Sequence, residues 1–187
     1  MRSLEEVTKE TAKALKELDI EYVIVGGVAV AGWGNIRTTR DVDVILSLKA
    51  EDVKKIVQAF RNRGFFVNEK DVLDALKEKS HFTIFDERSE YHIDVKGAYG
   101  ENERRTLRTK KRVGIGGVDA YIASPEDIIA NKLRFGSEQD LKDAEGIYIR
   151  QLGKLDLRYL EEICGKMGVQ EELVELRKRV KGIALGG

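Results

Sequence analysis

The 187-residue sequence predicts an α+β fold, in which a mixed β-sheet is flanked by helices and followed by a helical C-terminal region. Short apolar or alternating segments, separated by turn residues, fill most of the first two-thirds of the chain and are typical of strands. Segments with apolar residues at helical spacing lie between them. From Ser124 onward only the helical pattern remains. We therefore expect a core over residues 1–123 and a helical region over residues 124–187 that completes the cleft of the core.

The first predicted elements lead directly to the residues of interest. Residues 4–18 carry apolar residues on one helical face, and Ser3 and Glu6 have the spacing of a capping box. A strand at about 21–25, the pair Gly26–Gly27 and a short helix follow. The remaining expected elements of the core are a strand at 41–47, a helix at 51–63, a short strand at 65–67, a helix at 69–79, a hairpin of strands 81–85 and 91–96, and a second hairpin of strands 113–115 and 118–122.

The helical region has a clear start signal. Ser124 is a favourable N-cap, Pro125 suits the first helical position, and Asp127 stands in the first turn. Further helices are expected near 138–151, 156–166 and 171–181.

Composition limits the functional classes. The chain has 33 Lys and Arg and 33 Asp and Glu, so its formal net charge is zero and any site for a polyanion must be a local patch. A single cysteine, Cys164, excludes an intramolecular disulfide. No apolar run approaches the roughly 18 residues that a membrane span needs. The N-terminus is acidic and amphipathic, unlike a signal peptide. We expect a cytoplasmic protein without a membrane partner.

Three aspartates lie in strand-like segments. Asp41 and Asp43 alternate with valines, so their side chains point to the same face. Asp94 lies in a second alternating segment, residues 91–95. If the two strands are neighbours, the three carboxylates converge, and they repel one another unless a cation lies between them. Hard carboxylate oxygens suit Mg²⁺ or Mn²⁺, which also take phosphate oxygens as ligands. The pattern predicts a divalent-metal site that receives a nucleoside triphosphate (NTP).

The pair Gly26–Gly27 follows the first strand and precedes a short apolar segment. Glycine allows backbone N–H groups to approach a phosphate closely. We expect this turn to contact the triphosphate.

These motifs together resemble the nucleotidyltransferase superfamily with the polymerase-β-like catalytic core. The likeness covers roughly residues 20–150 and is closest to small prokaryotic members related to abortive-infection type nucleotidyltransferase toxins. The matching segments are Gly26-Gly27, the Arg-x-Thr-x-Asp-x-Asp pattern of residues 37–43, Asp94, the Ser-Pro-Glu-Asp segment that leads to Lys132, and Lys142-Asp143. Many members have Gly-Ser at the phosphate turn, where this chain has a second glycine.

The resemblance implies an enzyme that transfers a nucleoside monophosphate from an NTP to a hydroxyl and releases pyrophosphate. Asp41, Asp43 and Asp94 would be catalytic and hold Mg²⁺ or Mn²⁺. Nucleotide contacts would come from Gly26, Gly27, Arg37, Thr39 and Lys132. The acceptor would be an RNA end such as that of a tRNA, a protein or a small molecule, and a cognate toxin or antitoxin is a further expected partner. The alternative is a non-catalytic nucleotide-binding or toxin–antitoxin component with the same fold.

Several residues admit a plainer interpretation. Arg37 pairs with a surface carboxylate as readily as with a phosphate, and Thr39 is better explained as support for the loop before Asp41. Lys132 could be a snorkelling surface lysine. For Lys142 and Asp143 a solvated helix face is favoured slightly. His81 and His92 are more typical of structural residues, although His92 shares the face of Asp94.

A basic run, residues 104–112, carries six positive charges in nine positions. Such runs are usually solvated, but a local patch of this kind is what a neutral chain would need to contact RNA phosphates.

Overall fold

The computed structural model describes residues 1–35 and 38–185, with side chains up to residue 182. Its internal contacts divide the chain into two compact units, which are described separately. The first comprises Met1–Val28 and Thr38–Ala123. The second begins at Ser124 and also includes the segment that begins at Ala29. The division therefore falls at the predicted start of the helical region and also within the short helix that begins with the glycine pair.

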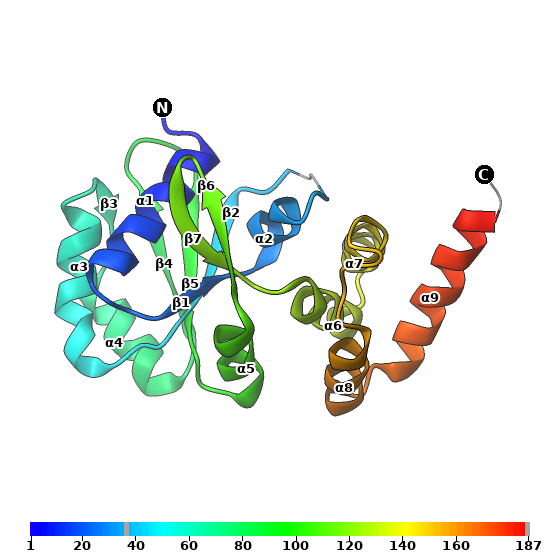
Figure 1. The fold of residues 1–187 in the computed structure, drawn as a ribbon. Helices are drawn as coiled ribbons and strands as arrows, with labels where there is room; N and C mark the ends of the chain where they lie inside the picture. Colours follow the sequence, from blue (N-terminus) through cyan, green and yellow to red (C-terminus); the bar gives the residue numbers. More distant parts are fainter. Residues whose placement is uncertain (36–37, 186–187) are drawn as a thin grey trace. The chain divides into compact units, whose positions relative to one another are not determined.

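The first unit is built on a seven-stranded sheet with the order β3-β4-β5-β2-β1-β7-β6 (Figure 1). The pairs β2–β5 and β1–β7 are parallel and the other neighbours are antiparallel, so the sheet is mixed. This arrangement confirms the predicted α+β class. The strands are β1 (Tyr22–Ile24), β2 (Asp41–Leu46), β3 (Phe65–Phe66), β4 (His81–Asp86), β5 (His92–Gly97), β6 (Lys111–Ile115) and β7 (Val118–Ile122).

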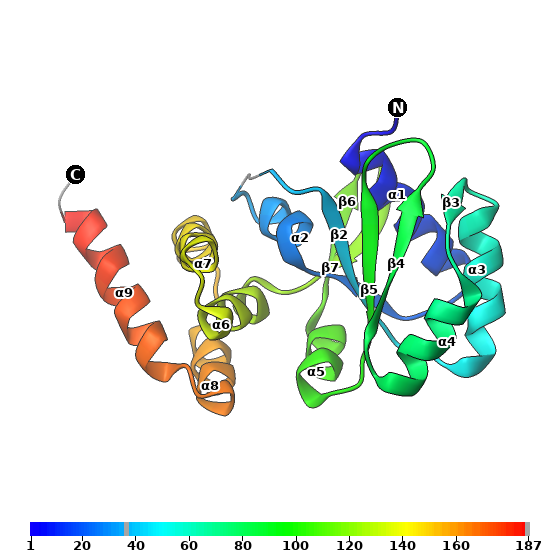
Figure 2. The ribbon, with the colours of Figure 1, turned by 180° about the vertical axis from the view of Figure 1, so that it is seen from behind.

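The helices that accompany the sheet begin and end largely where the sequence predicts. The capping box of Ser3 and Glu6 is present at the start of the first helix. The helices are α1 (Leu4–Glu17), α2 (Gly26–Gly32), the short 3-10 helix η1 (Ala50–Asp52), α3 (Val53–Arg61), α4 (Glu69–Glu78) and α5 (Glu101–Thr109). In Figure 2, the strands β4 and β5 are seen in front of α1.

Alternation along the central strands separates two faces of the sheet. In β2 the side chains of Val42, Val44 and Leu46 are at most 1% exposed, whereas the residues between them are half-buried. In β5, Ile93 and Val95 are likewise buried, and their neighbours are more exposed. The apolar face therefore forms the core with the helices packed on it, and the opposite face carries the polar residues of β2 and β5.

The helix α5 was not expected from the sequence, which indicated only a basic run there. Gly100 is the N-cap, and its backbone N–H donates to the Glu103 carboxylate, which completes a capping arrangement. Only Thr106 and Leu107 of this helix are buried, so its apolar periodicity is too weak to detect. The following strand β6 begins at Lys111, two residues earlier than expected.

Besides the C-terminal part of α2, the described residues of the second unit form the helices α6 (Pro125–Phe135), α7 (Glu138–Arg150), α8 (Leu157–Met167) and α9 (Gln170–Leu185). Ser124 caps α6 by accepting a hydrogen bond from the backbone N–H of Asp127. Cys164, in α8, is buried. Within the described ranges, every helix is too short or too polar to cross a membrane.

Candidate active site

Asp43 and Asp94 face each other across two neighbouring parallel strands. The register of β2 and β5 pairs Asp43 with Asp94 and Asp41 with His92. Paired residues in adjacent strands point to the same face, so all three predicted carboxylates lie on the exposed face of the sheet. The strands that carry Asp41, Asp43 and Asp94 are thus neighbours, which is the condition under which their carboxylates were expected to converge.

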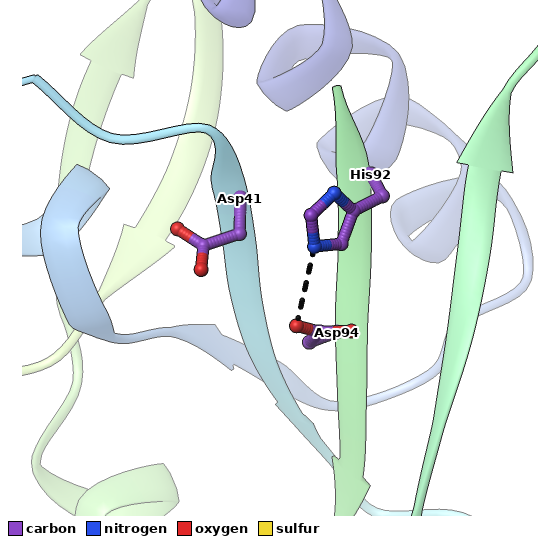
Figure 3. Close-up of side chains that lie close together, drawn as sticks. All are labelled: Asp41, His92 and Asp94. Atoms are coloured by element: carbon purple, nitrogen blue, oxygen red, sulfur yellow. Dashed lines mark ion pairs between the residues drawn. The ribbon is translucent and has the colours of Figure 1, made fainter. Parts of the chain in front are cut away.

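Three ligand-type side chains come together at the beginning of these strands (Figure 3). One potential ligand atom each from Asp41, His92 and Asp94 lies within 4.8 Å of the others. The His92 Nε2 and Asp94 Oδ2 atoms are 3.5 Å apart, and both side chains are about one-third exposed. The cluster is thus open to solvent and rich in oxygen donors, as expected for a metal site that also receives a substrate.

Two threonine hydroxyls orient the carboxylates. Thr39 Oγ1 donates to Asp41 Oδ1 at 2.5 Å, and Thr83 Oγ1, on β4, donates to Asp94 Oδ1 at 2.7 Å. Each hydroxyl occupies one carboxylate oxygen and leaves the second oxygen for other partners. The hydrogen bond to Asp41 agrees with the plainer interpretation of Thr39, as a residue that supports the loop before Asp41. Thr83 was missed, because only the pairing of β4 with β5 brings it opposite Asp94.

The glycine turn is in direct contact with Asp43. Gly26 has a φ of +59°, and a Cβ atom there would lie 1.8 Å from Asp43 Oδ2. The backbone N–H of Val25 also donates to the carbonyl oxygen of Asp43 at 2.9 Å. Only glycine fits at position 26, for reasons of both space and backbone conformation. Gly27 follows in the first turn of α2.

Of the other predicted nucleotide-contacting residues, Arg37 lies outside the described residues. Lys132 lies on α6 in the second unit, where its ammonium is 2.6 Å from Asp140 Oδ1 and 3.2 Å from Asp143 Oδ2. The side chain of Lys132 is only 13% exposed, so it is no snorkelling surface lysine. Its contact with a triphosphate stays a prediction.

The partners of Lys132 form a buried polar network on α7. The side chain of Asp143 is completely buried and accepts hydrogen bonds from Gln139 and Asn35. Burial raises the pKa of the Asp140 carboxyl, but hydrogen bonds from Lys132 and Ser137 and the charge of Lys132 outweigh it and hold that pKa below its ordinary value. The expectation of a solvated helix face is therefore wrong for Asp143. It is correct for Lys142, which is exposed and pairs with Glu138.

The basic run is largely neutralised by acidic neighbours. Arg104 and Arg108 both pair with Glu101 one or two turns away on α5. Lys110 pairs with Glu21, and Arg112 pairs with Asp119 on the adjacent strand β7. Because at least four of its six cations are paired within the protein, the run is a poor candidate for a strong phosphate-binding patch.

Comparison with protein families gives a match over nearly the whole chain. Residues 2–180 match the model of the family described as "Nucleotidyltransferase of unknown function (DUF6036)". No curated protein matches the chain.

Several solved structures share the fold. An antigenic nucleotidyltransferase-like protein from Paracoccidioides brasiliensis is 18% identical, with a TM-score of 0.61 over 94% of this chain and 92% of that chain. ANT(2'')-Ia in complex with adenylyl-2''-tobramycin is 12% identical, with a TM-score of 0.56 over 87% and 94% of the two chains. The lincosamide antibiotic adenylyltransferase LnuA, bound to lincomycin, is 14% identical, with a TM-score of 0.50 over 79% and 96%. At these identities the likeness shows a common nucleotidyltransferase-like fold.

Proposed function

The chain belongs to the nucleotidyltransferase family whose model it matches over residues 2–180, and we propose that it is a metal-dependent enzyme that transfers a nucleoside monophosphate from an NTP to a hydroxyl acceptor. The observation that carries this proposal is the direct pairing of Asp43 with Asp94 beside Asp41. A protein that only binds nucleotides does not need three carboxylates on one open sheet face.

The donor set fits a hard divalent cation. The cluster offers carboxylate oxygens from two neighbouring strands, and Thr39 and Thr83 already orient two of them. Such oxygen ligands suit Mg²⁺ or Mn²⁺, and a ring nitrogen of His92 is the third potential ligand of the cluster, beside Asp41 and Asp94. When bound, the metal would supply charge neutralisation at the phosphates.

The residues of the chain would then have distinct roles. Asp41 and Asp43 would hold the metal against the triphosphate, and the backbone of Gly26 and Gly27 would approach the β- and γ-phosphates. Asp94 would complete the metal site and help to deprotonate the attacking hydroxyl. Most of the rate enhancement would come from positioning and electrostatic stabilisation, because phosphoryl-type transfer needs little covalent chemistry from the protein.

The acceptor class is a separate question. The solved structures named above include a complex with adenylyl-2''-tobramycin and a lincosamide antibiotic adenylyltransferase, which supports a small-molecule acceptor as one class. A small molecule, a protein side chain and an RNA end, such as that of a tRNA, all carry suitable hydroxyls.

Incubation with each α-³²P-labelled NTP, Mg²⁺ or Mn²⁺, and total RNA or cell lysate tests the proposal. We expect a labelled acceptor with the wild-type protein and none with Asp94→Asn, which keeps the shape of the side chain and removes its negative charge. Failure of every NTP with either metal, while NTP binding is retained, would contradict catalysis and favour the nucleotide-binding module.

A further inference from the structure

An aromatic row extends from the carboxylate cluster across the open face of the sheet. Strand register pairs Phe66 with Phe85, Phe85 with His92, and His92 with Asp41. Phe66 and Phe85 are 53% and 52% exposed, which is unusual for two adjacent phenylalanines. The rings of Phe85 and His92 lie 6.2 Å apart with a tilt of 35°. We call Phe66, Phe85 and His92 the aromatic row.

The chemistry of the proposed function, on which this inference rests, fixes the side from which the acceptor enters. The attacking and leaving oxygens lie roughly in line on opposite sides of the α-phosphorus. The glycine turn that would hold the leaving pyrophosphate follows β1, which is next to β2 on one side. On the other side of β2 lie β5, β4 and β3 in that order. An acceptor hydroxyl that attacks in line must therefore approach over these three strands.

We propose that the aromatic row is the acceptor subsite and that it stacks the terminal base of a single-stranded nucleic acid. Exposed aromatic rings bind nucleobases through their π-faces with little dependence on sequence. Phe85 is paired with His92 and is therefore diagonal to Asp94, two residues further along β5. Diagonal neighbours across antiparallel strands are about 7–8 Å apart. A nucleoside whose base lies on Phe85 can thus place its 3′-hydroxyl beside Asp94.

A nearby cation complements a polyanionic strand. The side chain of Arg40 is 77% exposed and lies 4.0 Å from Glu90, in the turn between β4 and β5. Exposed ion pairs of this length contribute little, so the guanidinium can exchange Glu90 for a phosphate of the strand. Arg40 directly precedes Asp41, and Glu90 lies in the turn between the end of β4 and the beginning of β5. This cation therefore lies near the end of the sheet where the aromatic row meets the carboxylate cluster.

The reaction at this subsite is balanced. The 3′-oxygen forms a bond to the α-phosphorus of the NTP, and the bond from that phosphorus to the oxygen bridging the α- and β-phosphates breaks. The electron pair leaves with pyrophosphate, and the hydroxyl proton passes to Asp94 and then to solvent. The strand gains one nucleotide.

Binding of short 5′-fluorescein-labelled single strands with free 3′-hydroxyls, one RNA and one DNA of the same sequence, tests the subsite by fluorescence anisotropy. We expect Phe85→Ala to raise the Kd of the preferred strand roughly 5- to 150-fold, the loss of one base–aromatic stack. Phe85→Tyr keeps the ring and should restore binding. Arg40→Gln should lower the slope of log K against log salt by about 1.

Leu73→Ala is the matched control, because Leu73 is an exposed apolar residue of α4 in the same unit. It should bind like the wild type. Equal binding by Phe85→Ala and the wild type, or labelling of only proteins or small molecules, would overturn the subsite.

The two proposals fail in different ways. Label transfer that depends on Asp94 but not on Phe85 would leave the transferase standing and overturn the subsite. Phe85-dependent strand binding without any transfer would contradict the enzyme and support the aromatic row as a nucleic-acid surface.

Discussion

The carboxylate of Asp43 occupies the space that any side chain on Gly26 would need. A Cβ atom on Gly26 would lie 1.8 Å from Asp43 Oδ2, and the φ of Gly26 is +59°. The turn proposed to contact phosphate and the aspartate proposed to hold metal are therefore built as one unit, so a change at either should disturb both.

Gly26→Ala tests this coupling. A left-handed conformation alone costs an L-residue about 1–2 kcal/mol, and here a clash with Asp43 adds to it. We expect a larger loss of unfolding free energy than this, together with loss of the Mg²⁺ response, measured by urea denaturation and thermal melting. Gly117→Ala is the control, because Gly117 has a φ of +78° and no atom within 4 Å of its added Cβ. Equal effects of the two substitutions would argue against the coupling.

Metal binding should stabilise the protein. A ligand present at 100 times its Kd stabilises the native state by about 2.7 kcal/mol, so Mg²⁺ or Mn²⁺ should raise the Tm, more so with NTP. The Asp41→Asn, Asp43→Asn double variant should lose this response, and without metal it should be as stable as wild type or more so because repelling charges are removed. A double variant of two exposed aspartates on α4, Asp71→Asn and Asp74→Asn, should keep the response. If the metal raises the Tm of both double variants equally, the ions bind at residues other than Asp41 and Asp43.

Lys132 should be needed for stability as well as for nucleotide binding. Lys132→Met removes the ammonium that lies 3.2 Å from the fully buried Asp143 carboxylate, and removal of one partner from a buried pair costs about 3–5 kcal/mol. Urea denaturation should show this loss, and the addition of Asp143→Asn should recover part of it.

The same double variant separates the two roles of Lys132. If the ammonium also meets the triphosphate, NTP affinity stays about ten- to a hundredfold lower after stability is recovered. Recovery of NTP affinity along with stability would show that Lys132 acts through the fold alone.

Asp140 should contribute to the loss of folding stability at acidic pH. Its folded-state pKa lies below the ordinary value of 3.8, so near that value the unfolded chain binds more protons and stability increases with pH. The contribution is fully present above the unfolded pKa and is lost as pH falls through the folded pKa. Asp140→Asn should lower the unfolding free energy at pH 7 by about 1.5–3 kcal/mol and flatten the decline below about pH 4. Urea titrations across this range measure both effects, with Asp74→Asn as the control. An unchanged acid limb in Asp140→Asn would contradict this role.

Local patterns in the sequence were sufficient for most of the fold. Alternation located β2 and β5 and placed the aspartates on one face, and the N-cap at Ser124 located α6. The weakly apolar α5 was missed because burial of only two residues gives no clear helical period.

The details of the site depend on strand pairing and helix packing, which local patterns do not determine. His92 and Thr83 join the aspartates only through the registers of β5 with β2 and with β4. Likewise, Asp143 was expected on a solvated face because charged residues on a helix are usually solvated, but the packing of α6 against α7 buries it beside Lys132. Alternation also could not show that Phe66 and Phe85 are adjacent and exposed.

Asp41, Asp43 and Asp94 are proposed to hold the catalytic metal. Anomalous diffraction from crystals grown with Mn²⁺ and a non-hydrolysable NTP analogue tests it most directly. We predict a manganese peak coordinated by these three carboxylates, with phosphate oxygens of the analogue as further ligands, and no such peak in Asp43→Asn crystals. A peak at other side chains, or an analogue bound away from the Gly26–Gly27 turn, would contradict the account.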